Sequence, residues 1–169
     1  MRKKVLAFIF VLVAVSCKHS YEVFSNKHMV SFSCDISKSP FNKVQTAGYF
    51  LGIRPTSTKD GYRVMEPNGK EQTIPYTEVH SRVFSFGLAG LIIGMPYFGE
   101  GEYYAYDLAC PRCDNASSPL NINDEGLATC SKCSSIYDLN NSGIPKTSDS
   151  RPLYRYRTAT NGNMLIVSN

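Results

Sequence analysis

Four cysteines in two pairs are the part of this sequence that most directly indicates chemistry. Cys110 and Cys113 form one C-x-x-C pair, 16 residues follow, and Cys130 and Cys133 form the second pair. In each pair a tight turn can bring the two thiols together, and two such turns can hold one metal ion between four thiolates. A doublet with this spacing is far more specific than a single C-x-x-C. The sequence therefore predicts a metal site made by all four cysteines.

Several chemistries are compatible with these ligands. The site could hold one zinc or iron ion, an iron–sulfur cluster with only cysteine ligands, or no metal but two disulfides if the chain reaches an oxidising compartment. A thioredoxin-like role is weaker, because the residues after Cys113 do not predict the helix N-terminus that lowers the pKa of an attacking thiol. Of these alternatives we favour a bound metal, and among the metals we favour zinc. Four protein ligands close the coordination sphere, so its expected role is structural.

The first 16 residues predict export. A basic head, Met1–Lys4, precedes an unbroken apolar run, Val5–Val15. Eleven residues are too few to span a bilayer, which needs about 20, but they suit a signal peptide. Removing residues 1–16 takes away three basic residues and no acidic ones, which leaves 15 basic and 14 acidic residues. The remaining net charge of +1 gives no indication of a nucleic-acid partner.

A second cysteine chemistry is indicated at Cys17. The residues before it, Ala14, Val15 and Ser16, resemble the lipobox of bacterial lipoproteins, although Leu is usual where Ala14 stands. This resemblance implies cleavage before Cys17 and acylation of its thiol, with the protein anchored in a bacterial envelope membrane, the outer membrane slightly favoured. The alternative is cleavage and release, with Cys17 free or paired with Cys34. If Cys17 is acylated, Cys34 is expected to be a buried thiol.

Residues 17–31 read as the lipid anchor and a polar tether that can end in a first strand, and residues 32–169 as one β-domain. Short segments rich in Tyr, Phe, Val and Ile alternate there with Gly, Pro, Asn and Asp, and no helical apolar period is sustained. The expected fold class is therefore all-β, an antiparallel sandwich or small barrel. The predicted strands are Tyr49–Ile53, Tyr62–Met65, Val83–Phe86, Leu91–Gly94, Tyr103–Asp107, Gly126–Thr129, Ser135–Leu139, Leu153–Thr158 and Met164–Val167.

The last two predicted strands form the clearest hairpin. Asn161-Gly162-Asn163 separates them, and Asn-Gly supplies the positive φ angles of a tight turn. Alternating aromatic residues in two other predicted strands, Phe84 with Phe86 and Tyr104 with Tyr106, are expected to fill the core.

Residues 103–138, and more loosely residues 80–169, resemble a Rieske domain. Tyr104–Asp107 is similar to the strand that leads into the first ligand loop, and Cys110 and Cys130 match the first cysteine of each loop. Cys133 stands where the second loop has a histidine. Further matches to the residues after that position are Ser135, Tyr137 and Asp138.

The departures from the Rieske pattern concern the ligands. The first loop reads C-x-x-C in place of C-x-H, and Ser134 stands where a glycine is usual. The only histidines, His19, His28 and His80, precede the motif and are expected to be linker or surface residues. A Rieske cluster depends on two imidazoles on one iron, so the resemblance implies the fold and the loops at 108–138 rather than that cluster. The expected centre resembles a zinc ribbon or a rubredoxin-like iron site.

No phosphate-binding loop, nucleophile elbow or zinc-protease motif is present, and no catalytic residue is identified. The sequence therefore predicts an exported lipoprotein with a structural zinc and a binding or scaffolding role. The alternative is an electron-transfer protein with a 2Fe-2S cluster or one iron. Its partners would be the membrane, through Cys17, and an unidentified protein or redox partner. Whether it is an enzyme stays open, with the balance against it.

Overall fold

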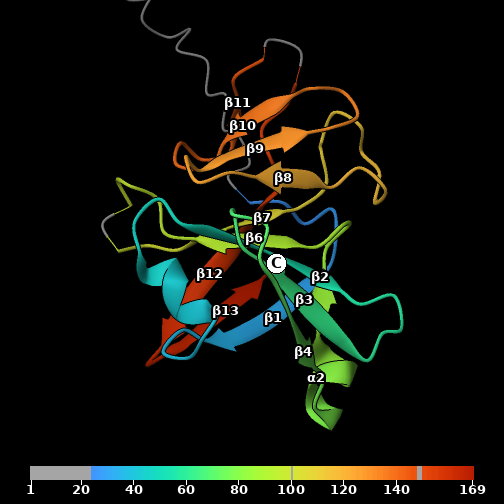
Figure 1. Cartoon of the computed structure of the whole chain (residues 1–169), viewed down its shortest axis with the longest axis vertical. Coiled ribbons are helices and arrows are strands. Elements are labelled where there is room, and N and C mark those ends of the chain that lie inside the picture. Colours follow the sequence, from blue (N-terminus) through green and yellow to red (C-terminus); the bar gives the residue numbers. More distant parts are fainter. Residues whose placement is uncertain (1–23, 100, 148–149) are drawn as a thin grey trace, which may run out of the picture.

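The fold is seen in a computed structural model that describes residues 24–99, 101–147 and 150–169 (Figure 1). The predicted signal peptide, Cys17 and His19 lie outside these residues. Strands dominate the described chain, and every pairing between named strands is antiparallel. The predicted all-β class is therefore confirmed. Among the described residues, no helix is long and apolar enough to cross a membrane.

A large sheet forms the lower part of the molecule in Figure 1, and a small sheet lies above it. In spatial order, the large sheet contains β4 (Glu71–Pro75), β3 (Gly61–Met65), β2 (Phe50–Pro55), β6 (Leu91–Gly94), β7 (Tyr104–Asp107), β12 (Arg155–Asn161), β13 (Met164–Ser168), β1 (Val30–Asp35) and β5 (Ser85–Phe86). The small sheet contains β11 (Ile144–Pro145), β10 (Ile136–Asp138), β9 (Leu127–Cys130) and β8 (Leu120–Ile122).

The large sheet curls on itself, because residues from both of its ends share one core. Phe32 of β1 packs edge-on against Tyr62 of β3, with ring centroids 5.6 Å apart, although five strands lie between β3 and β1 in the sheet. The ring centroid of Phe86 of β5 lies 5.9 Å from that of Tyr62. A 3-10 helix, η1 (Phe41–Gln45), adds Phe41 and Val44 to the same cluster. This closure matches the sandwich or small barrel expected from the sequence.

A second core lies between the two sheets. Ile92 and Tyr106 point into it from the large sheet, and Ala128 and Tyr137 from the small one, all of them fully buried. The next residues along β6 and β7, such as Ile93, belong to the first core. Strands β2, β6 and β7 thus separate two cores, and apolar residues bury both of their faces. This arrangement fixes the small sheet, and the cysteine loops it carries, on the larger one.

The prediction of a strand over Val83–Phe86 is wrong in its first half. A short helix, α2 (Glu78–Val83), ends there, and only Ser85–Phe86 forms a strand. Thr77 caps the helix by accepting a hydrogen bond from the backbone N–H of His80. Thr77 is the one local sequence feature that indicates this helix, as a capping residue. The segment itself is too short to show the apolar periodicity of a helix.

Four further strands have too weak a sequence pattern to be predicted with defined bounds, and each has a local reason. Strand β1 alternates buried and exposed positions but begins inside the predicted tether. Strand β4 is almost wholly exposed, and β8 and β11 have three and two residues. Such segments carry too little apolar pattern to be recognised alone.

The C-terminal hairpin is confirmed. Asn161 of β12 pairs with Met164 of β13, so Gly162 and Asn163 form a two-residue turn. Gly162 has a φ of +57°, a conformation that glycine adopts without steric cost.

Candidate metal centre

Two loops of nearly the same backbone geometry carry the four cysteines. The first loop follows β7, and the second connects β9 to β10. In the first, the N–H of Asp114 donates to the carbonyl of Cys110 over 2.8 Å; in the second, the N–H of Ser134 donates to the carbonyl of Cys130 over 2.9 Å. Asp114 and Ser134 have φ angles of +48° and +58°. Each C-x-x-C therefore closes a tight turn that aims both thiols to one side.

The two turns face each other, and their sulfur atoms meet. The Sγ atoms of Cys110 and Cys133 are 3.5 Å apart, and those of Cys113 and Cys130 are 3.9 Å apart. All four Sγ atoms lie within 4.8 Å of one another. Thiolates about 2.3 Å from a single zinc ion would be roughly 3.8 Å apart at tetrahedral angles. The closest contacts exceed a disulfide bond of about 2.05 Å. The donor set therefore fits one four-coordinate ion.

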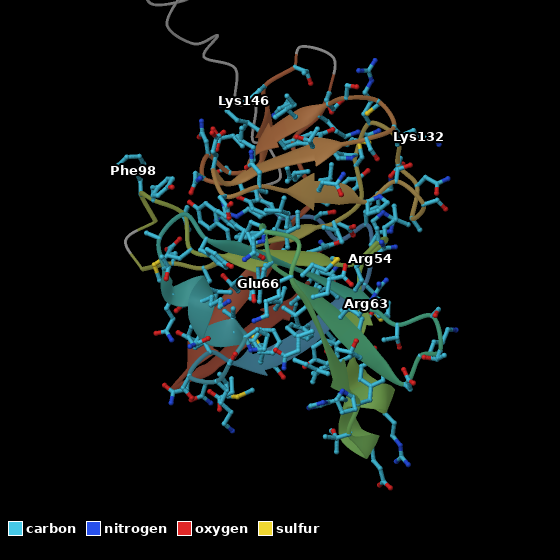
Figure 2. The ribbon with its side chains drawn as sticks, in the orientation of Figure 1. Arg54, Arg63, Glu66, Phe98, Lys132 and Lys146 are labelled. Carbon is cyan, nitrogen blue, oxygen red and sulfur yellow. The ribbon has the colours of Figure 1, made fainter. Side chains whose placement is uncertain are left out.

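The small sheet buries one side of this sulfur cluster. Cys110 and Cys130 are buried, whereas Cys113 and Cys133 are half-buried. Arg112 and Lys132, one inside each C-x-x-C, are exposed, and Lys132 points outward in Figure 2. An ion bound here would lie near the surface, with a positive side chain on each loop. Those cations would offset the net negative charge of four thiolates around a divalent ion.

Hydroxyl groups contact two of the sulfurs. The Tyr137 hydroxyl lies 3.4 Å from the Cys110 Sγ and 2.6 Å from the Ser150 hydroxyl. The hydroxyl of Ser135, which is itself buried, lies 3.3 Å from the Cys133 Sγ. Such contacts orient metal ligands and adjust their basicity.

The electrostatic environment differs between the thiols. Burial, followed by contacts with the neighbouring cysteines, raises the pKa of Cys113 to about 12, and burial also raises the pKa of Cys130. Burial acts in the same direction at Cys133, but contacts with the Ser135 side chain and backbone, together with Cys110 and Cys113, outweigh it and lower the pKa to about 6. Of these three thiols, Cys133 therefore ionises first. Burial raises the pKa of Tyr137 to about 12, which keeps its phenol neutral.

A buried carboxylate that the sequence analysis did not single out fixes the first loop. Asp107, at the end of β7, is 0% exposed. It accepts hydrogen bonds from the N–H groups of Leu88 (2.6 Å), Ala89 (3.2 Å) and Ala109 (2.7 Å), and from the Tyr156 hydroxyl (2.7 Å). Ala109 immediately precedes Cys110, so this hydrogen bond fixes the backbone next to the first ligand. These four donors satisfy the Asp107 carboxylate. Because most of them lie far from Asp107 along the chain, no local sequence pattern indicates that it holds the first loop.

A second clamp joins the first loop to the N-terminal part of the described chain. Lys27 forms an ion pair with Asp114, with 2.5 Å between Nζ and Oδ2. The Tyr154 hydroxyl donates to the other carboxylate oxygen of Asp114 over 2.8 Å and accepts from Lys27 over 3.0 Å. Asp114 follows Cys113 directly, so these bonds hold the loop at its turn.

Comparisons with known proteins give structural neighbours only. No protein-family model matches the chain, and no curated protein matches its sequence. A ferredoxin of carbazole 1,9a-dioxygenase from Nocardioides aromaticivorans IC177 is 16% identical; the match covers 46% of this chain and 73% of that one, with a TM-score of 0.34. A complex of reduced oxygenase and oxidised ferredoxin in carbazole 1,9a-dioxygenase contains a chain that is 14% identical. The match covers 70% of this chain and 92% of that one, with a TM-score of 0.36. The Sphingomonas yanoikuyae B1 ferredoxin is 16% identical; the match covers 70% of this chain and 96% of that one, with a TM-score of 0.35.

The order of elements around the cysteines agrees with the expectation from the sequence. Strand β7 leads into the first loop, β8 and β9 follow, and β10 begins just after the second loop. The two cysteine loops meet at one end of the small sheet, and among the described residues no histidine joins the four cysteines of the cluster.

The remaining predicted residues lie apart from the cluster. Cys34 is 4% exposed in the first core, and burial raises the pKa of its thiol to about 12. His28 contacts the ring of Tyr154 edge-on, and His80 stacks on Phe84 with ring centroids 4.4 Å apart. Cys17, the predicted acylation site, lies outside the described residues and stays a prediction.

Proposed function

We propose that this protein is a membrane-anchored, exported lipoprotein whose Rieske-like domain binds one structural zinc ion through Cys110, Cys113, Cys130 and Cys133. The observation that carries the proposal is the approach of four sulfur atoms to within 4.8 Å of one another. A dinuclear cluster would need to separate its thiolates into two pairs, one on each iron, so this spacing favours a single ion. Zinc suits four closed thiolate ligands and has no redox chemistry.

The role proposed for the metal is to hold the two loops together. The loops come from different strands, and the described contacts between them are mainly the sulfur contacts. When bound, the ion supplies a cross-link without chemistry of its own. Asp107 and Tyr137 would keep the first loop in the binding geometry, and Ser135 would stabilise the thiolate of Cys133. The domain as a whole would then serve as a stable binding or scaffolding module at a membrane.

An electron-transfer protein with iron is the second candidate. The hydroxyl contacts of Tyr137 and Ser135 to sulfur favour it, since hydrogen bonds to sulfur set the potential of iron–sulfur centres. Colour distinguishes the two candidates: a zinc protein is colourless, whereas iron–thiolate centres absorb visible light.

The test is metal analysis and thermal unfolding of protein isolated from its native host, because overexpression can insert a different metal. We expect one zinc per chain, no visible absorption, and a lower melting temperature after chelation, since metal-binding free energy contributes to folding. Cys110→Ser and Cys133→Ser should each remove the metal and lower the melting temperature in the same way.

Cys34→Ala is the matched control, because it removes a cysteine of the first core. It should keep the full metal content even if it lowers stability. Equal melting temperatures for metal-loaded and chelated protein would contradict the structural role, and stoichiometric iron with visible absorption would replace it by the second candidate.

A further inference from the structure

The segment Phe24–Met29 is fixed along one flank of the domain. Besides the ion pair of Lys27 with Asp114, the N–H of Ser25 donates to the carbonyl of Arg155 over 2.7 Å. The side-chain amide of Asn169 donates to the carbonyl of His28 over 2.5 Å. These contacts attach the segment to the first cysteine loop, to β12 and to the C-terminal residue. The point at which the chain leaves the domain towards Cys17 is therefore defined.

Chain length limits how far this flank can be from an anchor. Six residues lie between Cys17 and Phe24, and the seven Cα–Cα steps that join them span at most about 25 Å when fully extended. A compact domain of this size is roughly 35 Å across. If Cys17 carries acyl chains in a bilayer, the surface around Phe24 must stay near the lipid headgroups, and the opposite side of the domain cannot take its place.

The side chains on this flank suit a headgroup region. Phe24, Ile144, Pro145, Pro152 and Leu153 line a shallow groove whose surface is mostly apolar. Ile144 is 40% exposed. Such a surface can enter the boundary between headgroups and acyl chains.

Basic residues border the groove. Arg151, which is exposed, and Arg155, which is half-buried, line the groove itself. Arg157 is exposed beside it, with its guanidinium 5.2 Å from the centre of the Phe24 ring. Three described acidic side chains lie nearby. Glu102 lines an adjoining groove with Arg155, Asp114 is paired with Lys27, and Asp138, opposite Ile144 in the small sheet, lies 3.9 Å from Lys146.

We propose that this flank is a membrane-apposed surface that contacts anionic lipid headgroups, with the groove facing the bilayer and Arg151 and Arg157 on phosphate groups. The inference rests on the acylation of Cys17 in the proposed function. Each cation near an anionic surface adds to the attraction, while the acyl chains supply the anchorage itself. The result is a single preferred orientation, in which the first cysteine loop lies on the membrane side through Asp114 and Lys27.

Tryptophan fluorescence can test this orientation, because the chain contains no tryptophan. The mature acylated protein is reconstituted into vesicles of phosphatidylethanolamine and phosphatidylglycerol that carry nitroxide-labelled headgroups. Ile144→Trp places the reporter on the flank. Val79→Trp is the matched control on α2, where Val79 is 66% exposed at the end of the molecule away from the small sheet (Figure 1). We expect quenching about twofold or more stronger for I144W than for V79W.

Two further arms separate the causes. Adding Arg151→Gln and Arg157→Gln to I144W, or replacing phosphatidylglycerol by phosphatidylcholine, should lower the excess quenching to the part that the short tether alone produces. In the unsubstituted protein, amide hydrogen exchange over residues 150–157 should be slower in anionic vesicles than in detergent, with no change over α2. This second readout does not depend on any variant folding.

The outcomes are distinct. Acylated protein with equal quenching at the two reporters, or with equal exchange in vesicles and detergent, overturns the surface while leaving the anchor in place. Protein whose mass shows no acyl chains overturns the anchor and this orientation together. Excess quenching of I144W over V79W that is undiminished without Arg151 and Arg157 overturns the role of the charges.

Discussion

Two residues with positive φ angles set the geometry of the cysteine turns. Asp is one of the residues that tolerates this region, and Asp114 gains an ion pair there. Ser134 is exposed, and no hydrogen bond of its side chain is described. Its backbone conformation therefore carries a steric cost without a visible compensation, at the position where the Rieske pattern has glycine.

Ser134→Gly should stabilise the protein. Relief of the left-handed conformation is worth roughly 1 kcal/mol, reduced by the greater freedom of glycine in the unfolded chain. Urea unfolding of the metal-loaded protein should show a higher midpoint. Ser142→Gly is the matched control, since Ser142 has a φ of +53° in a turn without cysteines. Metal affinity should rise for S134G alone; equal affinity in the two variants would argue against a strained metal loop.

Among the elements, Asp107 joins the end of β7, the turn before β6 and strand β12. Gly87 allows this approach, because a Cβ there would lie 2.3 Å from the Asp107 carboxylate. The first cysteine loop thus depends on a contact that three segments share.

Asp107→Asn should therefore destabilise the fold and weaken metal binding. An amide replaces one acceptor oxygen by a donor that faces N–H groups, at a cost of about 2–3 kcal/mol. Denaturant unfolding and a zinc competition titration would measure the two effects. Tyr156→Phe removes one of the four hydrogen bonds and should cost less, about 1 kcal/mol. An unchanged unfolding midpoint for D107N would show that the carboxylate is not needed.

A second ion pair joins η1 to Glu66, the residue that follows β3. The Glu66 carboxylate lies 2.5 Å from Lys43 Nζ and accepts from the Tyr49 hydroxyl over 3.0 Å. The hydrogen bond with Lys43 is the main cause that lowers the pKa of Glu66. A carboxylate with a lowered folded pKa stabilises the protein above its unfolded pKa of about 4.3, and this contribution is lost as the pH falls through the folded value.

Glu66→Gln should accordingly lower the melting temperature at pH 7 and have little effect near pH 3. The difference between variant and wild type isolates this pair, because acid also protonates the cysteine thiols in both proteins. Glu71→Gln breaks the exposed pair with Arg63 and should change stability little at either pH. A difference for E66Q that stays constant from pH 7 to pH 3 would contradict this account.

The elements also show what the sequence could and could not predict. The cysteine spacing placed both loops, and Asn161–Asn163 placed the last turn, because each is a local pattern. The partners of Asp107 and the contact of β1 with β3 across the core depend on residues far apart in the chain. No local pattern encodes such contacts, and the short helix α2 was hidden for lack of length.

At the scale of the whole molecule, the five cysteines of the described residues fall into two chemical environments. Four surround the candidate metal position, while Cys34 lies in the first core with its pKa raised to about 12. Reaction with a thiol reagent requires both exposure and a thiolate.

Thiol labelling counted by mass should therefore proceed in steps. Among the cysteines of residues 24–169, we expect none to react in the metal-loaded protein. After chelation Cys133 should react first, because it is half-buried with a lowered pKa, and the other three should follow as the loops loosen; Cys34 should react only after unfolding. In Cys34→Ala the last step should disappear while the first two remain. Rapid labelling of Cys34 in the folded, metal-loaded protein would contradict its burial.

Strands β2, β6 and β7 are buried on both faces, and this has a consequence for how the chain can vary. Residues Leu91–Ile93 contact one core or the other at every position, so a change of volume disturbs packing on one side whichever residue is replaced. In the exposed edge strand β4, only the half-buried Ile74 packs against a core. Tolerance to substitution should thus decline from the rim of the large sheet towards its middle, and homologues should diverge most along Glu71–Pro75.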